Sequence, residues 1–290
     1  MYEMRLRAYA KVNLGLDVLR RREDGYHEVK MVMQTVGIYD SIHLKKLKSP
    51  GIRVATNLFY LPDNENNLVY KAAKLLMDEF GLPGGIFIDL QKRIPVAAGM
   101  AGGSSDAAAV LYGMNRMYHL KLSKKELMQR GVKLGADVPY CIMRGTALAE
   151  GIGERLSPLP PVPNCHVLVA KPPVSVSTKF VYENLKLDGS LKHPDVDLVI
   201  EGIRGGDLHK VASHMGNVLE SVTVSHYPVI AQIKEDMMQA GALQAMMSGS
   251  GPTVFALFED EGLAKQAYQK LLEKDQAKQV YLTDMFNVRE

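Results

Sequence analysis

The sequence has no tryptophan and only two cysteines, Cys141 and Cys165, among its 290 residues. Two cysteines are too few for a disulfide framework or a four-cysteine zinc site, so we expect both to be reduced, buried thiols. The sequence also lacks a run of about 18 apolar residues, which excludes a membrane-spanning helix. The first residues include Glu3, Arg5 and Arg7 where a secretion signal would be apolar, and we therefore expect a cytosolic protein.

An excess of one charge sign is missing as well, because 35 Lys and Arg residues stand against 32 Asp and Glu residues, a net charge of +3. No basic cluster occurs, so the charge does not favour a nucleic-acid-binding protein. Hydrophobic residues make up 47% and charged residues 23% of the chain, which is typical of a globular protein. At about 150 residues per domain, the length predicts two domains.

Hydrophobic periodicity predicts a mixture of strands and helices. In the first half, alternation predicts strands at 29–33 and 86–90, and helical spacing predicts a helix from Leu68 to Phe80. Ser123 and Glu126 form a capping-box motif that predicts a helix start, and Gly135 predicts the end of that helix. In the second half we expect strands at 166–170, 243–247, 253–258 and 279–284, and helices at 177–186, 195–203, 207–221, 229–240 and 260–273.

The segment from Ser157 to Pro163 contains four prolines, which disfavour both helix and central strand. We therefore place a domain boundary there, with a first domain at 1–160 and a second at 161–290. Strands and helices mixed in this way predict an α+β fold with helices on one face of a sheet.

The stretch from Pro95 to Ser105 contains three glycines and two serines, and the alanines at 107–109 that follow predict a helix. Free N–H groups and about half a positive charge at such a helix start attract phosphate. The alternative is an ordinary serine N-cap after a flexible turn. Neither G-x-x-x-x-G-K-[ST] nor G-x-G-x-x-G occurs, so we expect the missing cation to come from Mg²⁺ and from a lysine on another segment.

Lys11 and Asp137 are the candidate catalytic side chains. Alternation over 8–18 predicts a strand with Lys11, Asn13 and Gly15 on one face, although an isolated lysine is typical of a solvated surface. Asp137 follows a glycine and precedes a proline, and it either caps the next turn or accepts a proton from a substrate hydroxyl. A nearby lysine would keep that carboxylate ionised and neutralise a transferred phosphoryl group.

A second glycine-rich turn runs from Met247 to Thr253 between two apolar segments. One interpretation is a β-turn whose glycines supply positive φ angles. In the other, Gly249 and Ser250 close over phosphates or over the reacting hydroxyl. The motif G-x-S-x-G is absent, so a nucleophile elbow is excluded.

These segments, in this order and at this spacing, resemble the galactokinase, homoserine kinase, mevalonate kinase and phosphomevalonate kinase (GHMP) superfamily of small-molecule kinases, over nearly the whole chain. The quoted motifs are Ala10-Lys11-Val12-Asn13-Leu14-Gly15-Leu16, Asp24-Gly25-Tyr26-His27-Glu28, Gly102-Gly103-Ser104-Ser105-Asp106-Ala107-Ala108 and Gly135-Ala136-Asp137-Val138-Pro139. They are similar to the branch that phosphorylates a cytidine diphosphate sugar alcohol in the non-mevalonate isoprenoid pathway.

The resemblance implies a fold and a reaction. The expected fold is α+β with two domains, the first like domain 2 of ribosomal protein S5 and the second ferredoxin-like, with the active site between them. The expected reaction transfers the γ-phosphoryl group of ATP to the 2-hydroxyl of the sugar alcohol, with Lys11 and Asp137 as the catalytic pair. Residues expected to wrap the ATP phosphates are Pro95, Val96, Ala97, Ala98, Gly99, Met100, Ala101, Gly102, Gly103, Ser104 and Ser105.

The resemblance also implies a cytosine site. Asn13 would assist near the reacting hydroxyl, and Tyr26 and His27 would hold the base, although a surface turn is the alternative for these two. For the aromatic ring on the far side of the base, we prefer Tyr182 to Phe180. No residue is assigned as a Mg²⁺ ligand.

Two rival functions stay open. Another kinase of the superfamily, for homoserine or mevalonate, would not need Tyr26 and His27, and a non-catalytic nucleotide-binding protein would not need Lys11 with Asp137. We further expect no nucleic-acid or membrane partner, and a monomer or weak homodimer.

Overall fold

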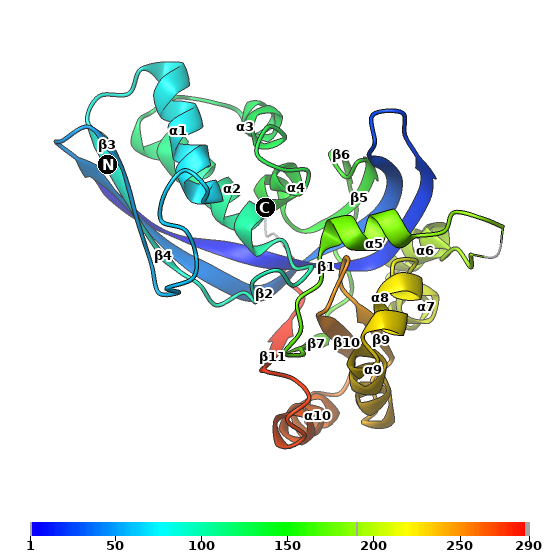
Figure 1. Ribbon diagram of the computed structural model, residues 1–290. Helices are drawn as coiled ribbons and strands as arrows, with labels where there is room; N and C mark the ends of the chain where they lie inside the picture. The colour runs from blue at the N-terminus through cyan, green and yellow to red at the C-terminus, as the bar shows by residue number, and fades with distance from the viewer. Residues whose placement is uncertain (1, 190, 288–290) are drawn as a thin grey trace. The chain divides into compact units, whose positions relative to one another are not determined.

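The computed structural model describes residues 2–189 and 191–287 (Figure 1). The chain divides into two units. Unit 1 comprises Met1–Ala10, Ile38–Val96 and Ala101–Met143, and unit 2 comprises Lys11–Gly37, Ala97–Met100 and Arg144–Glu290. Strands β1 (Glu3–Arg21) and β2 (His27–Leu47) contribute residues to both units. The predicted boundary at residue 160 lies within unit 2, and the division into two consecutive domains stays a prediction.

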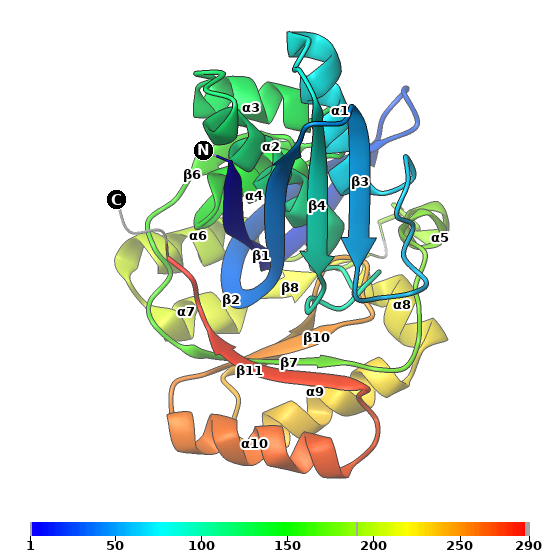
Figure 2. The same cartoon turned by 90° about the vertical axis from the view of Figure 1, so that its left-hand side faces the viewer.

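Unit 1 is a sheet with four helices on one face, as Figures 1 and 2 show. Strand β4 runs parallel to β3 and antiparallel to the second half of β2. Fully buried apolar side chains such as Leu44, Ile88 and Leu76 form its core. Besides β1 and β2 its elements are β3 (Gly51–Thr56), β4 (Gly85–Gln91), α1 (Leu68–Phe80), α2 (Gly102–Met117), α3 (Lys124–Gly131) and α4 (Val138–Met143).

Local sequence signals set the helix ends in unit 1, with one correction. Helix α1 matches its predicted bounds, and the capping box of Ser123 and Glu126 is present at the start of α3. The prediction that Gly135 ends α3 is wrong, because the helix stops at Gly131. A Cβ on Gly131 would lie 2.9 Å from Val138, so the close packing of α3 on α4 occurs at this glycine.

Unit 2 contains a four-stranded antiparallel sheet in the order β11-β7-β10-β9, with α9 and α10 on one face (Figure 2). All four strands match predicted strands. The bounds are β7 (His166–Lys171), β9 (Gln244–Met247), β10 (Val254–Phe258), β11 (Gln279–Asp284), α9 (Val229–Gln239) and α10 (Glu261–Glu273). The sequence did not predict strands β5 (Thr146–Gly151) and β6 (Arg155–Pro158). Strand β5 pairs antiparallel with the first half of β2, and β6 pairs antiparallel with β5.

The remaining helices of unit 2 correct one prediction. The single helix expected at 207–221 is two helices separated by the short strand β8 (Gly216–Asn217), which pairs with Gly15 and Leu16 of β1. A Cβ on Gly216 would lie 2.6 Å from Pro194, so the glycine allows this close approach. The helices are α5 (Thr178–Asn184), α6 (Val196–Gly205), α7 (Leu208–His214) and α8 (Glu220–His226). Among the helices described, none is both long and apolar enough to cross a membrane.

Candidate active site

Lys11 and Asn13 lie two residues apart on β1 and are buried within unit 2, with exposed fractions of 4% and 0%. The Nζ atom of Lys11 donates hydrogen bonds to Oδ1 of Asn13 at 2.7 Å and to the carbonyl oxygen of Gly99 at 3.0 Å. The surface alternative for Lys11 is therefore wrong. Both acceptors are neutral, so they orient the ammonium group without cancelling its charge, which leaves it suited to an anion.

The two glycine-rich segments meet at Gly99. Its carbonyl oxygen also accepts a hydrogen bond from Oγ of Ser248, at 3.0 Å. Gly99 has a φ angle of 71°, and a Cβ there would collide with the carbonyl oxygen of Ser248, so only glycine fits. Within unit 2 the structure thus brings together Lys11, the middle of the predicted phosphate loop and the turn that contains Gly249 and Ser250.

Asn217, on β8, holds the second glycine turn from behind. Its Nδ2 atom donates to the carbonyl oxygens of Met247 and Gly249, each at 2.8 Å, and its Oδ1 accepts from the backbone N–H of Leu219 at 3.0 Å. The residue is 7% exposed. Asn217 was not predicted from the sequence, because it lay inside an expected helix; the pair Gly216-Asn217, which is typical of turns, was the available signal.

The second part of the predicted phosphate loop belongs to unit 1 and opens α2. The N-cap position is occupied by Ala101, with a φ angle of 55°, and no described side chain caps this helix start. Ser105 lies inside the first turns, where its hydroxyl donates to the carbonyl oxygen of Tyr9 at 2.7 Å. The serine N-cap alternative is therefore wrong, and the first N–H groups of α2 are left for another acceptor such as a phosphate.

Asp137 precedes α4 in unit 1 and is half-buried. Its carbonyl oxygen accepts a hydrogen bond from the backbone N–H of Cys141 at 3.0 Å, which starts the helix. A Cβ on nearby Gly135 would lie 3.9 Å from Oγ of Ser104, so this turn contacts the start of α2. Lys11 belongs to unit 2. The contact between Asp137 and Lys11 therefore stays a prediction.

The predicted cytosine site has an aromatic pair in unit 2. The rings of His27 and Tyr182 lie 5.0 Å apart at 39°, whereas the ring of Phe180 lies 5.1 Å from that of His226. Of the two candidates, Tyr182 is the one whose ring contacts His27, and which of them stacks on the base stays a prediction. Burial, together with the charge of Arg21, lowers the pKa of His27, which favours a neutral ring with one donor and one acceptor for a base edge.

Two other predicted contacts have defined positions. The side chain of Ser250 is joined to that of Thr178 by a hydrogen bond of 2.9 Å, which places the second glycine turn beside the start of α5. Tyr26 is 61% exposed, and its ring has no aromatic partner within the part of the chain that the structure describes. Its role toward the base stays a prediction.

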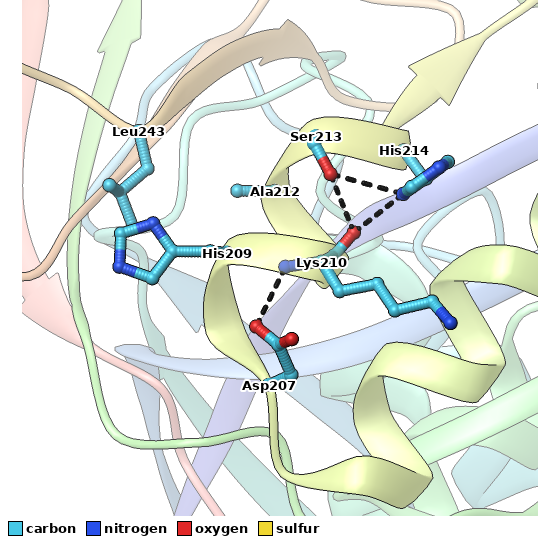
Figure 3. A pocket seen from close by; sticks show the side chains of 7 residues that line it. All are labelled: Asp207, His209, Lys210, Ala212, Ser213, His214 and Leu243. Carbon is cyan, nitrogen blue, oxygen red and sulfur yellow. Dashed lines mark hydrogen bonds between the residues drawn. The ribbon is translucent and has the colours of Figure 1, made fainter.

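A separate pocket of about 530 Å³ lies at α7 and contains none of the predicted site residues (Figure 3). Two of its polar side chains are paired with groups on α6 and α7. Lys210 pairs with Glu201 at 2.9 Å, and Nδ1 of His214 lies 2.9 Å from the carbonyl oxygen of Lys210. We assign it no part in the candidate site. Over residues 2–189 and 191–287, no group of three or more His, Cys, Asp or Glu side chains is arranged to hold a metal ion.

Comparisons with known proteins agree with the expected superfamily. Residues 67–145 match the family described as GHMP kinases N terminal domain, and residues 199–277 match GHMP kinases C terminal. A 4-diphosphocytidyl-2-C-methyl-D-erythritol kinase from Lachnospira eligens is 59% identical over 99% of each chain, and one from Lachnoclostridium phytofermentans is 58% identical over 97% of each. A crystal structure of 4-(cytidine 5'-diphospho)-2C-methyl-D-erythritol kinase is 33% identical, with a TM-score of 0.85 over 98% of this chain and all of that one.

Proposed function

Because the chain belongs to the GHMP kinases and, within them, to the 4-diphosphocytidyl-2-C-methyl-D-erythritol kinases, we propose that it phosphorylates the 2-hydroxyl of 4-diphosphocytidyl-2-C-methyl-D-erythritol. ATP supplies the γ-phosphoryl group, and ADP and the 2-phosphate are the products. The observation that carries the proposal is the identity to relatives of that name over nearly the full length of the chain. The alternative of a non-catalytic binding protein is not favoured by any observation.

The proposed mechanism uses position and charge rather than covalent chemistry. Phosphoryl transfer passes through a loose transition state, whose charge is spread over the equatorial oxygens. The free N–H groups at the start of α2 bind the phosphates, and Lys11, fixed by Asn13 and Gly99, neutralises charge on the transferred group. Asp137 orients the 2-hydroxyl and accepts its proton as the new P–O bond forms.

The cytidine part of the substrate is held away from the reacting hydroxyl. His27 and Tyr182 contact the base, one by hydrogen bonds to its edge and one by stacking, and Tyr26 adds a second aromatic surface. Gly249 and Ser250 close the site next to the phosphate loop. Because these groups do not react, their loss raises KM for the acceptor more than it lowers kcat.

Mg²⁺ enters this proposal only as part of the nucleotide substrate. Among the described residues, no group of three or more His, Cys, Asp or Glu side chains is arranged to hold the ion. Bound to the phosphates, the ion would neutralise part of their charge.

The finer fold assignment is also proposed. The four-stranded antiparallel sheet with α9 and α10 on one face supports the ferredoxin-like assignment of the second domain. The likeness of the first domain to domain 2 of ribosomal protein S5, the cytosolic location and the monomer or weak homodimer stay predictions.

A coupled ADP-release assay tests the function with three acceptors in parallel: 4-diphosphocytidyl-2-C-methyl-D-erythritol, homoserine and mevalonate. We expect turnover with the first alone, and phosphorus NMR should place the new phosphate on its 2-oxygen. Asp137→Asn should lower kcat by about 10²- to 10⁴-fold while ATP affinity changes little. Turnover with another acceptor, or ATP binding without turnover, would reject the proposal.

A further inference from the structure

A lysine and two aspartates form a buried cluster in unit 1. The side chains of Lys92, Asp40 and Asp106 are 5%, 0% and 3% exposed. Nζ of Lys92 donates hydrogen bonds to Oδ2 of Asp40 and to Oδ2 of Asp106, the latter at 2.7 Å. The other oxygen of Asp40 accepts the backbone N–H groups of Arg93 and Ile94, so every oxygen of Asp40 has a donor.

Asp106 is the member of the cluster that is incompletely paired. Its Oδ1 atom is buried and has no hydrogen-bond partner among the described residues. If all three groups were ionised, two negative charges and one positive charge would leave a net negative charge shielded from water. A buried ionised oxygen without a donor is costly, whereas a neutral carboxyl group in the same place is much less so. The geometry therefore calls for one proton on this pair of carboxylates.

The cluster touches the start of α2. A Cβ on Gly102, the first residue of the helix, would lie 3.1 Å from Nζ of Lys92. Under the proposed function this helix start binds the ATP phosphates. A net negative charge here would oppose the positive field of the helix N-terminus, whereas a neutral cluster leaves that field intact.

We propose that the pair of Asp40 and Asp106 binds one proton, which resides on Asp106, and that the resulting neutral Lys92–Asp40–Asp106 cluster is the form that binds the ATP triphosphate. Asp106 is then a positioning residue that acts through α2, without touching the substrate. The binding part of this inference rests on the proposed function; the shared proton does not.

The charged groups around Asp106 are few. The pKa of Asp106 is raised to about 8, because burial and the charge of Asp40 together outweigh the lowering by Lys92. Burial lowers the pKa of Lys92, but the two carboxylates together hold it above its usual value, so the lysine stays charged. Helix α4, which packs on α2, has no charged residue. The other two helices that pack on α2 are α1 and α3. Their charged side chains are exposed except that of Arg130, which is half-buried and pairs with Glu79: Lys71, Lys74, Asp78, Glu79, Lys124, Lys125, Glu126 and Arg130.

The first experiment measures the proton without reference to ATP, using Asp106→Asn as the neutral variant of the same shape. The folded pKa of Asp106 is raised above its unfolded value of about 4, so its contribution to stability is complete below that pH and is lost as pH rises to about 8. Between about pH 5 and 7 the unfolding constant of the wild type should therefore rise about tenfold per pH unit relative to that of the variant. Parallel stability curves would overturn the proposal.

A measurement on the wild type alone covers the case in which the variant fails to fold. An infrared band of a protonated carboxyl group should be present at about pH 7 and disappear above about pH 9, as the buried proton is lost. Absence of that band at neutral pH in the folded wild type would also overturn the proposal.

The second experiment measures ATP dissociation constants from about pH 7 to 9.5. We expect affinity of the wild type to fall about tenfold as the cluster becomes negative, while that of Asp106→Asn stays nearly constant. Equal pH dependence in both proteins would reject the link between the cluster and ATP. If the infrared band and the pH-dependent stability difference are both absent while the acceptor is still phosphorylated, this inference alone is rejected. If both are present but no acceptor is phosphorylated, the proposed function is rejected instead.

Discussion

The side-chain nitrogen of Lys11 donates a hydrogen bond to the carbonyl oxygen of Gly99, 3.0 Å away, although 88 residues separate them in the sequence. The same oxygen accepts the hydroxyl of Ser248. Three segments of unit 2 therefore meet at one backbone atom, which ties the position of the lysine to the shape of the predicted phosphate loop. Because a carbonyl oxygen has two lone pairs, both donors are satisfied together.

Replacing Lys11 by methionine removes the charge and keeps an unbranched side chain of similar length. We expect kcat to fall about 10²- to 10³-fold, because the transition state loses a preorganised positive group. Turnover and ATP binding should be measured together with thermal unfolding. Lys74→Met, on the exposed face of α1, is the matched control and should behave like the wild type. A loss of less than about tenfold in the Lys11 variant would reject its catalytic role.

The two candidate stacking residues are separated by a pair of alanine variants. Tyr182→Ala should raise KM for the cytidyl substrate about tenfold, because base–aromatic stacking contributes about 1–3 kcal/mol, while KM for ATP should not change. Phe180→Ala is the comparison, since its ring contacts His226 rather than His27. A larger rise in the Phe180 variant would reverse the assignment.

Tyr26→Ala should also raise KM for the acceptor, and an unchanged KM would remove Tyr26 from the site.

Short-range patterns in the sequence predicted most helices and strands, and the motifs at Lys11, Gly99 and Ser250 marked segments that the structure brings together in unit 2. Contacts between distant residues were not predictable in the same way. Lys92 meets Asp40 across 52 residues and Asp106 across 14, and single buried charges have no periodicity that would reveal such a cluster.

The backbone at Ala101 carries strain that the sequence did not reveal. Its φ angle of 55° lies in the left-handed region, which costs a residue with a Cβ about 1 kcal/mol. Ala101→Gly should therefore raise the free energy of unfolding by about 0.5–1 kcal/mol. Urea denaturation of this variant can be compared with that of Ala107→Gly, inside α2, which should lose at least about 1 kcal/mol. Destabilisation by both glycines would contradict the strain.

Cys165 is predicted to be almost inert toward thiol reagents in the folded protein. Burial, reinforced by the charge of Asp284, raises the pKa of its thiol to about 12, so at pH 8 only about one molecule in 10⁴ is a thiolate. In a Cys141→Ala variant Cys165 is the only thiol, and its reaction with a disulfide reagent can be followed directly. We expect a rate about 10³-fold below that of free cysteine, because reaction requires the thiolate.

The same thiol reports on the packing of the four-stranded antiparallel sheet of unit 2. Cys165 directly precedes β7, whose residues pair with both β10 and β11, so exposure of the thiol requires this part of the unit to open. In urea the labelling rate should therefore rise along the unfolding curve and reach the value for free cysteine once the chain is unfolded. Fast labelling without denaturant would show that the thiol is accessible in the folded state, and would contradict the burial on which its raised pKa depends.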